Sequence, residues 1–480
     1  MKKSFIYIFS AFCFSCGINS CSFLDENPAD RLVVDNFYTS EKDAQAAVDA
    51  TYQQLNSLYN RLMYMMAELP TDMMKNGLGM PNANLQDLEF LRFNSQNTFV
   101  KDMWKNCYSG ISRANTAIVK IPEIKMNESK KNRLIAEART LRALYYFNLV
   151  RFFGDVPLIL DLKTVEDSKG PRDSKELIYD QIIEDLTFAE EHLPLRSEYS
   201  ASDEGRINKG AAKILFGKVY LTKGDFQKAK DKLAEVVEHE SEYGFGLHKD
   251  YHANWLRDTE AGIEAVLYIE YKEPPFQHNG EMALAGPKYS IPGSLGISAL
   301  NEADIPTQEL YDQFDNRDLR KKTNFKTEFA HLKTGEILKS SIPLSGKFWV
   351  EGLETGDRCD VNMHIIRYAD AILMYAEALN ELGASTYQIP SWDGTQSYDI
   401  SRDKNEMSYA ISRVRIRGGV PDFGSDVYEN ADEFRKHLKH ERQIELFAEN
   451  SRYFDLRRWK DAEYEESQQM YGYNAYMSKT

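Results

Sequence analysis

Residues 137–157 read EARTLRALYYFNLVRFFGDVP, and they give the clearest secondary-structure signal in the chain. Apolar side chains recur here and just upstream at spacings of three and four residues, as on one face of an α-helix. Gly154 is a stop signal, and Pro157 prevents continuation. The pattern contains no catalytic arrangement, so it predicts a packed scaffold helix. The apolar positions are Leu134, Ala138, Leu141, Tyr145, Leu149 and Phe152.

Further segments have the helical period, and some of them resemble tetratricopeptide-like helix pairs. In the clearest pair, Gly217 and Tyr220 lie three residues apart on the first helix, and residues 223–226 form the turn. A small residue at position 217 would allow the two helices to approach closely. These additional helical segments are residues 40–58, 115–121, 212–237, 367–383 and 406–415.

Repeats of this kind need neighbours to bury their apolar faces. The sequence therefore predicts one domain, mainly α, with a helical scaffold over about 36–237 and 362–460. Between about 240 and 361 the helical period fades, residues 263–271 have the pattern of a strand, and Gly, Pro and Ser cluster over 274–297. We expect this loop-rich insert, with a few short strands, to contain the ligand site, because loops contain sites more often than repeats do.

The N-terminus has the features of an export signal over residues 1–20. Two lysines precede a mostly apolar stretch, residues 4–17, which has signal-peptide length and is too short to span a bilayer. Residues 18–21 read INSC and resemble the lipobox that lipoprotein signal peptidase cleaves. We therefore expect Cys21 to be the lipid attachment site and the first residue of the mature protein. The alternative is an ordinary cleaved signal with a chance cysteine.

The formal net charge of −15 argues against nucleic acid and against electrostatic binding to anionic lipid. It also disfavours strongly anionic polysaccharides, unless a local patch reverses the balance. No second hydrophobic run is long enough to span a membrane, so we expect attachment by lipid alone. Cys107 and Cys359 are the cysteines that follow Cys21, so at most one disulfide is available if Cys21 holds lipid. We expect free buried thiols instead.

Short motifs along nearly the whole chain resemble the RagB/SusD family of outer-membrane nutrient-binding lipoproteins. Each motif is weak alone, but their order is specific, and residues 137–157 are one of them. Members usually continue to a Pro-Ile-Pro segment and a final Gln-Asn-Pro-Gly, which this sequence lacks, so it is either truncated or a short variant. The other motifs lie at residues 23–28, 37–44, 104–118, 179–194, 209–212, 309–320, 367–378 and 441–459.

The resemblance implies a SusD-like fold and a function that is not enzymatic and needs no cofactor. Proteins of this family resemble lids. They face the cell exterior from the outer membrane, bind a glycan, and deliver it to a partner SusC-like TonB-dependent transporter. Such a site needs aromatic faces that stack on sugar rings and planar polar side chains that pair with hydroxyls.

The resemblance transfers no motif to the ligand-contacting positions, so the candidates are loop residues outside the helical motifs. Any one aromatic residue is more often packed than in contact with ligand, and Asp72 also suits a helix cap. Trp104 and Trp459 lie inside family motifs, so we interpret them as structural. The candidates are Asp72, Asn76, Asn94, Tyr271, Phe276, His278, Asn279, Tyr289, Trp349, Trp392 and Tyr398.

Enzyme signatures are weak. His248 and His252 stand four residues apart but lack the acidic residue of an HExxH motif, so we expect no metal site. The sequence has no G-x-S-x-G elbow, Walker loop or dinucleotide fingerprint. Three interpretations stay open: a surface glycan-binding lipoprotein, an adaptor that holds a partner without its own glycan or binds peptides, and a cell-surface glycoside hydrolase with a carboxylate pair. We favour the first.

Overall fold

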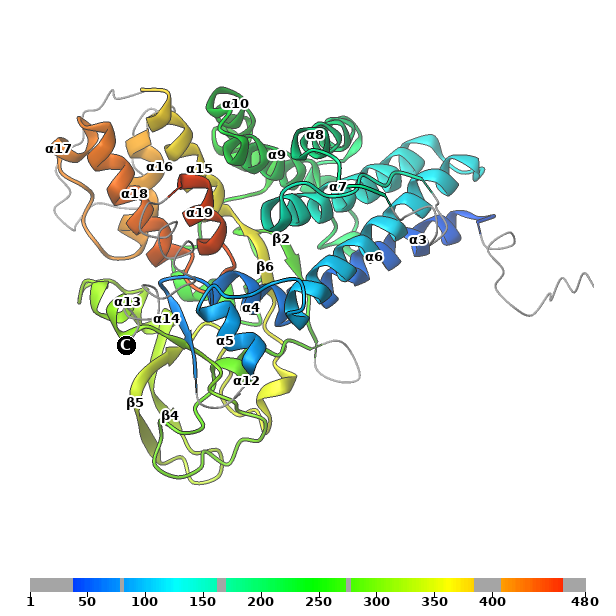
Figure 1. Ribbon diagram of the computed structural model, residues 1–480. Helices are drawn as coiled ribbons and strands as arrows, with labels where there is room; N and C mark the ends of the chain where they lie inside the picture. The colour runs from blue at the N-terminus through cyan, green and yellow to red at the C-terminus, as the bar shows by residue number, and fades with distance from the viewer. Residues whose placement is uncertain (1–37, 78–81, 162–169, 273–277, 384–406, 461–480) are drawn as a thin grey trace, which may run out of the picture.

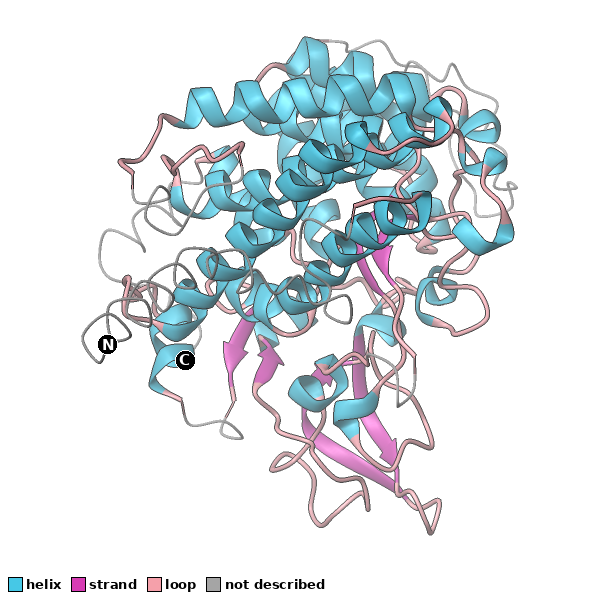
Figure 2. Cartoon of the chain, turned by 90° about the vertical axis from the view of Figure 1, so that its right-hand side faces the viewer, coloured by secondary structure: helices cyan, strands magenta, loops and turns pink. Residues whose placement is uncertain are grey.

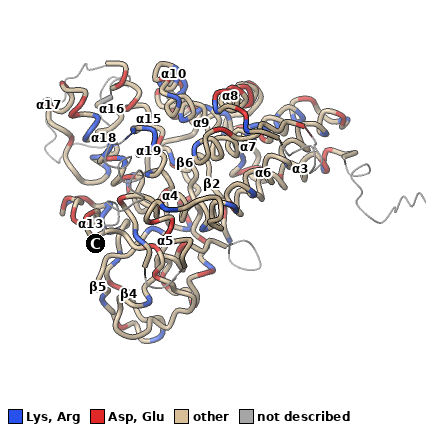
Figure 3. Tube along the Cα trace, in the orientation of Figure 1, with Lys and Arg blue, Asp and Glu red and all other residues tan. Residues whose placement is uncertain are grey.

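The computed structural model describes residues 38–77, 82–161, 170–272, 278–383 and 407–460. Long helices make up one broad part of the molecule, and short strands with loops project from it (Figures 1 and 2). Lys and Arg alternate with Asp and Glu along the outer helices, so the surface is mixed in charge (Figure 3). Within the described residues, no helix is both long and apolar enough to cross a bilayer.

The first six long helices pack side by side in chain order (Figure 1). The later helix α15 then packs against α10, and α16 and α18 pack against α15. The long helices are α3 (Glu41–Tyr59), α6 (Thr98–Lys120), α7 (Glu128–Phe153), α8 (Lys175–His192), α9 (Lys209–Lys223), α10 (Phe226–Val237), α15 (Tyr368–Glu381), α16 (Met407–Arg417), α18 (Ala431–Glu445) and α19 (Arg452–Trp459).

Short helices connect these elements. The short α-helices are α4 (Leu62–Glu68), α5 (Ala83–Glu89), α11 (Glu240–Tyr243), α12 (Glu281–Ala285), α13 (Gln308–Gln313), α14 (Lys321–Asn324) and α17 (Ser425–Tyr428). The 3₁₀ turns are η1 (Ile121–Glu123), η2 (Arg196–Glu198), η3 (Ala201–Asp203), η4 (Tyr251–Trp255) and η5 (Gly356–Arg358).

The strands of the described residues form three separate antiparallel pairs (Figure 2). The pairs are β1 (Met74–Asn76) with β3 (Asp304–Pro306), β2 (Ala265–Ile269) with β6 (Met363–Arg367), and β4 (Phe325–Ala330) with β5 (Ile337–Ser345). Most of them lie in the predicted loop-rich insert, and the strand predicted at 263–271 is confirmed as β2. The mainly helical fold class is therefore confirmed as well.

The predicted end of the scaffold helix α7 is confirmed. Gly154 caps it with φ +68°, and its N–H donates to Val150 O at 3.0 Å. Neighbouring helices surround α7, so polar residues off the apolar face are also buried. Arg142, for example, is 4% exposed and donates to both carboxylate oxygens of Asp185 at 2.8 and 2.7 Å.

The helix pair predicted around Gly217 forms α9 and α10. A Cβ added at Gly217 would lie 2.6 Å from Leu233 Cγ, so only glycine fits this crossing. Gly224 ends α9 in the left-handed region at φ +80°, and the Asp225 side chain caps α10 by accepting from Lys228 N. Both features make the tight turn that the sequence predicts.

Cys107 and Cys359 are both buried and free, as expected. Burial raises the pKa of both thiols, and that of Cys359 reaches about 12. Because the reactive form of cysteine is the thiolate, both thiols are protected in the folded protein.

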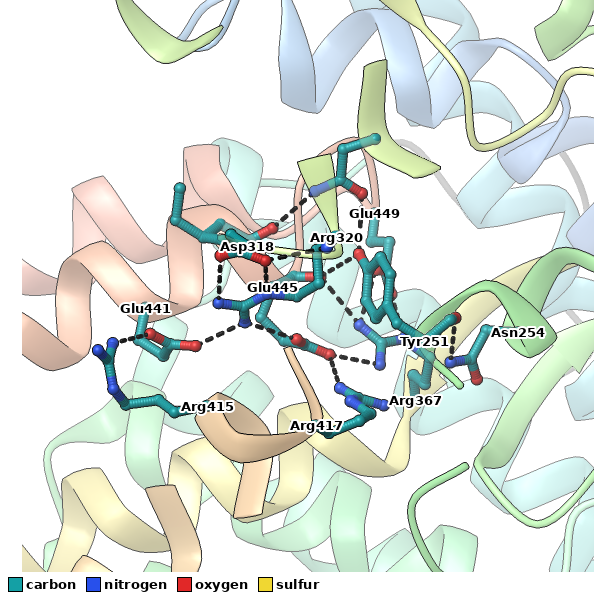
Figure 4. A network of polar contacts seen from close by, with 12 residues as sticks. Tyr251, Asn254, Asp318, Arg320, Arg367, Arg415, Arg417, Glu441, Glu445 and Glu449 are labelled. Atoms are coloured by element: carbon teal, nitrogen blue, oxygen red, sulfur yellow. Dashed lines mark hydrogen bonds and ion pairs between the residues drawn. The ribbon is translucent and has the colours of Figure 1, made fainter. Parts of the chain in front are cut away.

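A buried ionic network joins the loop-rich insert to the C-terminal helices (Figure 4). Glu445, at the end of α18, is its hub: it accepts from Arg320 Nη1 at 2.9 Å, from Arg367 Nη1 at 2.8 Å, and from Arg417. All four side chains are at most 1% exposed. The network balances five cations (Arg320, Lys347, Arg367, Arg415, Arg417) against five carboxylates (Glu264, Asp318, Glu441, Glu445, Glu449).

Candidate functional site

One concave surface has five aromatic rings among its eleven lining residues, and we call it the aromatic cavity. Its volume is about 430 Å³, which suits one or two sugar rings. It lies where the α5–α6 loop, the start of α6, the end of α7 and α19 meet. Its lining is Met66, Phe93, Asn94, Ser95, Val100, Lys101, Trp104, Phe152, Phe153, Arg172 and Tyr453.

Local capping fixes the loop that forms one wall of the cavity. Asn94 Oδ1 accepts from Gln96 N at 2.8 Å, which is an Asx turn. Asn97 then caps α6, since its Oδ1 accepts from Phe99 N at 3.0 Å. These two hydrogen bonds hold Phe93 and Asn94 at the cavity, and a bound ligand is not needed to fix the loop.

The rings of the cavity meet at different angles rather than in one layer. The Trp104 and Phe153 centroids lie 5.2 Å apart at 74°, and Phe152 stacks on Tyr453 at 5.5 Å and 28°. Trp104, Phe152 and Phe153 are each half-buried, so part of each ring faces solvent. Such surfaces bind the C–H faces of pyranose rings and need no reorganisation of the protein.

A second concave surface, the polar cleft, lies between α3, residues 196–208 and β2. It consists of two adjoining hollows of about 610 and 200 Å³. Arg206 lines both hollows and is already paired, contacting Asp49, Glu137 and Asp203. Tyr268 also lines both hollows, and burial raises the pKa of its hydroxyl to about 12. Its other cation, Arg196, donates to the backbone carbonyls of Gly262 and Ala261. With both guanidiniums occupied and few aromatic faces, this cleft fits a sugar less well.

The third candidate surface is the Tyr289 loop, residues 288–290. One carboxylate oxygen of Glu302 accepts from the backbone N–H groups of Lys288, Tyr289 and Ser290 at 2.7, 2.8 and 2.9 Å. Burial raises the pKa of Glu302, but these bonds outweigh it, and the net pKa is lowered. The loop is therefore fixed, and it leaves the Tyr289 ring 57% exposed.

The predicted ligand residues do not gather at one site. Asn94 lines the aromatic cavity, and Tyr289 forms its own loop. Tyr271 is 3% exposed and lies in the main core. Trp349 is half-buried and packs edge to face on Phe329 at 4.7 Å.

Two of the polar candidates, Asp72 and Asn279, have structural partners. Asp72 accepts from Arg452 at 2.9 and 2.6 Å. Asn279 is fully buried and pairs with the backbone of Cys359. Asn76 lies in β1, and His278 is half-buried. Cys21, Phe276, Trp392 and Tyr398 fall outside the described residues.

Sequence reasoning missed most of the cavity. Its place in a family motif indicates a structural role for Trp104, yet the residue is half-buried at the cavity wall. The helical pattern places Phe152 and Phe153 at the end of the scaffold helix. Their position beside the stop signal Gly154 indicates that one ring is exposed, because adjacent side chains at a helix end cannot both face the same core.

No metal-binding group of three or more His, Cys, Asp or Glu side chains occurs among the described residues. His248 lies near Glu264, and burial lowers its pKa, which favours the neutral ring. The described part of the chain thus offers binding surfaces and shows no assembled metal centre.

Two family models together match most of the chain. The model described as "SusD family" matches residues 259–480, and the one described as "Starch-binding associating with outer membrane" matches residues 22–221. The chain is 28% identical to "SusD-like protein P2" of Formosa agariphila, over 92% of the chain and 88% of that protein. It is 24% identical to a "SusD-like protein" of Bacteroides ovatus, over 92% and 79%.

Solved structures share the whole fold. A "Laminarin binding SusD-like protein" superposes with a TM-score of 0.74 at 25% identity, covering 92% of this chain and 96% of that one. A SusD superfamily protein from Parabacteroides distasonis gives a TM-score of 0.73 at 26% identity, with 88% of each chain covered.

Proposed function

This chain belongs to the SusD/RagB family, whose members are non-catalytic glycan-binding proteins, and from that premise we propose that it captures an oligosaccharide in the aromatic cavity. In this proposal the protein is anchored in the outer membrane through lipid on Cys21 and faces the cell exterior. It passes the glycan to a partner SusC-like TonB-dependent transporter. No bond in the ligand is made or broken.

The observation on which the proposal depends most is the grouping of aromatic rings around one solvent-reached hollow. Exposing apolar ring surface costs about 25 cal/mol per Å², and a group of exposed apolar side chains around one hollow is typical of a binding surface. Here four rings, those of Phe93, Trp104, Phe152 and Phe153, stay half-buried at one place, next to Asn94. A hydrated sugar ring, apolar on its faces and polar at its edges, matches both kinds of group.

The wider role is supported by relatives rather than by geometry. One matching model describes proteins that associate with the outer membrane, and one superposing structure is named for laminarin binding. The expected lipid at Cys21 agrees with outer-membrane attachment. We therefore extend membrane association, surface exposure and transfer to a transporter to this chain as parts of the proposal.

The test is affinity electrophoresis of the purified protein through gels that contain single polysaccharides, chosen by a glycan-array screen. Phe93→Ala is expected to weaken retention about 10-fold, because losing one stacking ring costs about 1–1.5 kcal/mol. Phe90→Ala is the matched control: Phe90 lies on the same loop, is half-buried, and does not line the cavity.

Each other outcome rejects part of the proposal. Equal retention of both variants and the wild type would remove the aromatic cavity as the site. If Tyr289→Ala alone abolished retention, the Tyr289 loop would be the binding surface. A blank glycan array would favour the adaptor or a peptide ligand, and capture of the transporter would then become the next measurement.

A further inference from the structure

The aromatic cavity differs in charge from the rest of the molecule. The chain has a formal net charge of −15, yet the charged side chains of the cavity lining are two cations, Lys101 and Arg172. Neither one forms an ion pair with any carboxylate in the part of the chain that the structure describes. An acidic protein that leaves two cations unneutralised beside one hollow has a local positive field there.

The positions of the two cations are defined. Lys101 lies in the first turns of α6, and its Nζ donates to Gln96 Oε1 at 3.0 Å. Arg172 enters from the segment before α8, with its guanidinium carbon 5.7 Å from the Trp104 ring centroid. Both side chains are exposed, so each can turn toward a bound anion at little cost. Trp104 lies near both cations: it belongs to α6, as Lys101 does, and its ring lies under the Arg172 guanidinium.

The polar cleft provides the contrast within the same molecule. Its Arg206 is enclosed by Asp49, Glu137 and Asp203, so the protein itself neutralises the cation. Glu204 and Glu270 add further negative charge to that cleft. Arg196, the second cation of that cleft, donates to the backbone carbonyls of Gly262 at 3.0 Å and Ala261 at 2.8 Å, so its guanidinium is already occupied. The two cations of the aromatic cavity are therefore more open to a ligand than those of the polar cleft.

We propose that the aromatic cavity selects saccharides with an anionic group, a uronate carboxylate or a sulfate. Trp104 and Phe153 would contact the ring face, while Lys101 and Arg172 would hold the anion. A guanidinium can bind either group through two parallel hydrogen bonds. This inference depends on the proposed function, because it names the ligand class of the same site.

The acidic net charge does not oppose this selection at contact distance. The Debye length at physiological salt is about 8 Å, so charges far from the cavity are largely screened. Contacts between the ligand anion and two adjacent cations lie well inside that length. The overall charge therefore lowers the rate of encounter, while local cations determine which ligand stays bound.

The test measures binding of a short oligouronate and of its carboxyl-reduced, neutral counterpart by isothermal titration calorimetry. A sulfated oligosaccharide and its desulfated form make a second pair of probes and distinguish the two anions. The double variant Lys101→Met with Arg172→Gln is expected to lose about 10-fold in affinity for the anionic member of at least one pair and clearly less for its neutral member. It should also lose salt dependence of binding. Lys105→Met, an exposed lysine of α6 outside the cavity, is the control.

Failure of this inference can be told apart from failure of the proposed function. If the wild type binds neutral members as well as anionic ones, or if the double variant keeps its affinity for anionic probes, the selection is rejected and glycan binding stands. If the wild type binds no saccharide, the selection and the proposed function are both rejected. Thermal unfolding of the double variant should match the wild type, because neither cation has a buried partner.

Discussion

Replacing Glu445 by Gln tests whether the buried ionic network holds the loop-rich insert to the helical scaffold. The change keeps the shape of the side chain and removes the one charge that three guanidiniums share, those of Arg320, Arg367 and Arg417. Burial alone would raise the pKa of Glu445, but these guanidiniums hold it well below its usual range. The carboxylate is therefore charged in the folded protein at neutral pH.

The expected cost follows from leaving buried cations in excess. Removing one partner of a buried ion pair typically costs about 3–5 kcal/mol, because the remaining charge loses its compensation in a medium of low polarity. With an unfolding entropy of about 2 cal/mol/K per residue, a chain of 480 residues has about 1 kcal/mol/K, so the melting temperature should fall by about 3–5 °C. The network would then hold more positive than negative charge, and the loop-rich insert and the C-terminal helices would be held together less tightly.

The assay is differential scanning calorimetry at pH 7, with Glu433→Gln as the matched control. Glu433 lies on the same helix α18, its side chain is 49% exposed, and its contacts with Lys436 and His437 are 3.9 and 4.0 Å long. Such surface pairs contribute at most about 1 kcal/mol, so the control should shift the melting temperature by less than 1 °C. A Glu445→Gln melting temperature within 1 °C of the control would refute the reasoning.

Two further predictions concern packing and titration. Gly217→Ala should lower the free energy of unfolding by about 1–3 kcal/mol, because its Cβ would lie 2.6 Å from Leu233 Cγ. In the same urea titration Gly170→Ala is neutral, since its Cβ would meet nothing within 4 Å; equal midpoints would contradict this. Burial raises the pKa of Glu281 to about 8 from 4.5, although Arg61 N donates to it. Its stabilising contribution is complete below pH 4.5 and disappears as the pH rises to 8. Between pH 6 and 8 it loses at most about 2–3 kcal/mol. Melting temperatures of Glu281→Gln should therefore fall less over this range than those of the wild type, and parallel curves would reject the assignment.

The sequence predicts well wherever the structure depends on neighbours along the chain. The end of α7 at Gly154 and the crossing at Gly217 both follow from residue type and spacing alone. The pattern also predicts the strand at 263–271, but it does not predict the burial of Tyr271. That residue follows β2, and its N–H donates to Asn362 Oδ1, 91 residues further along the chain.

Ion pairs between residues far apart in the chain cannot be predicted from the sequence, because they depend on the tertiary fold. Arg367 and Arg417 look like ordinary polar residues at helix ends, yet both contact Glu264, 103 and 153 residues away. The aromatic cavity likewise combines five separate segments, and no single segment has an unusual composition. Only the adjacent pair Phe152 and Phe153 gave a local sign that rings were exposed at a helix end.

Substitution of some residues destabilises the fold, whereas substitution of others changes only the ligand site. This difference explains how one fold can bind different ligands. Glu445 has three buried partners, so substitution there removes stability that the fold needs. Lys101 and Arg172 lie exposed at the cavity, and neither has a buried partner, so substitution there alters only the field that a ligand meets. A superposing structure with 25% identity and a TM-score of 0.74 shows that the fold tolerates change at about three positions in four. Ligand preference can therefore diverge at the cavity rim while the network keeps the scaffold constant, and relatives with the same fold need not share a glycan.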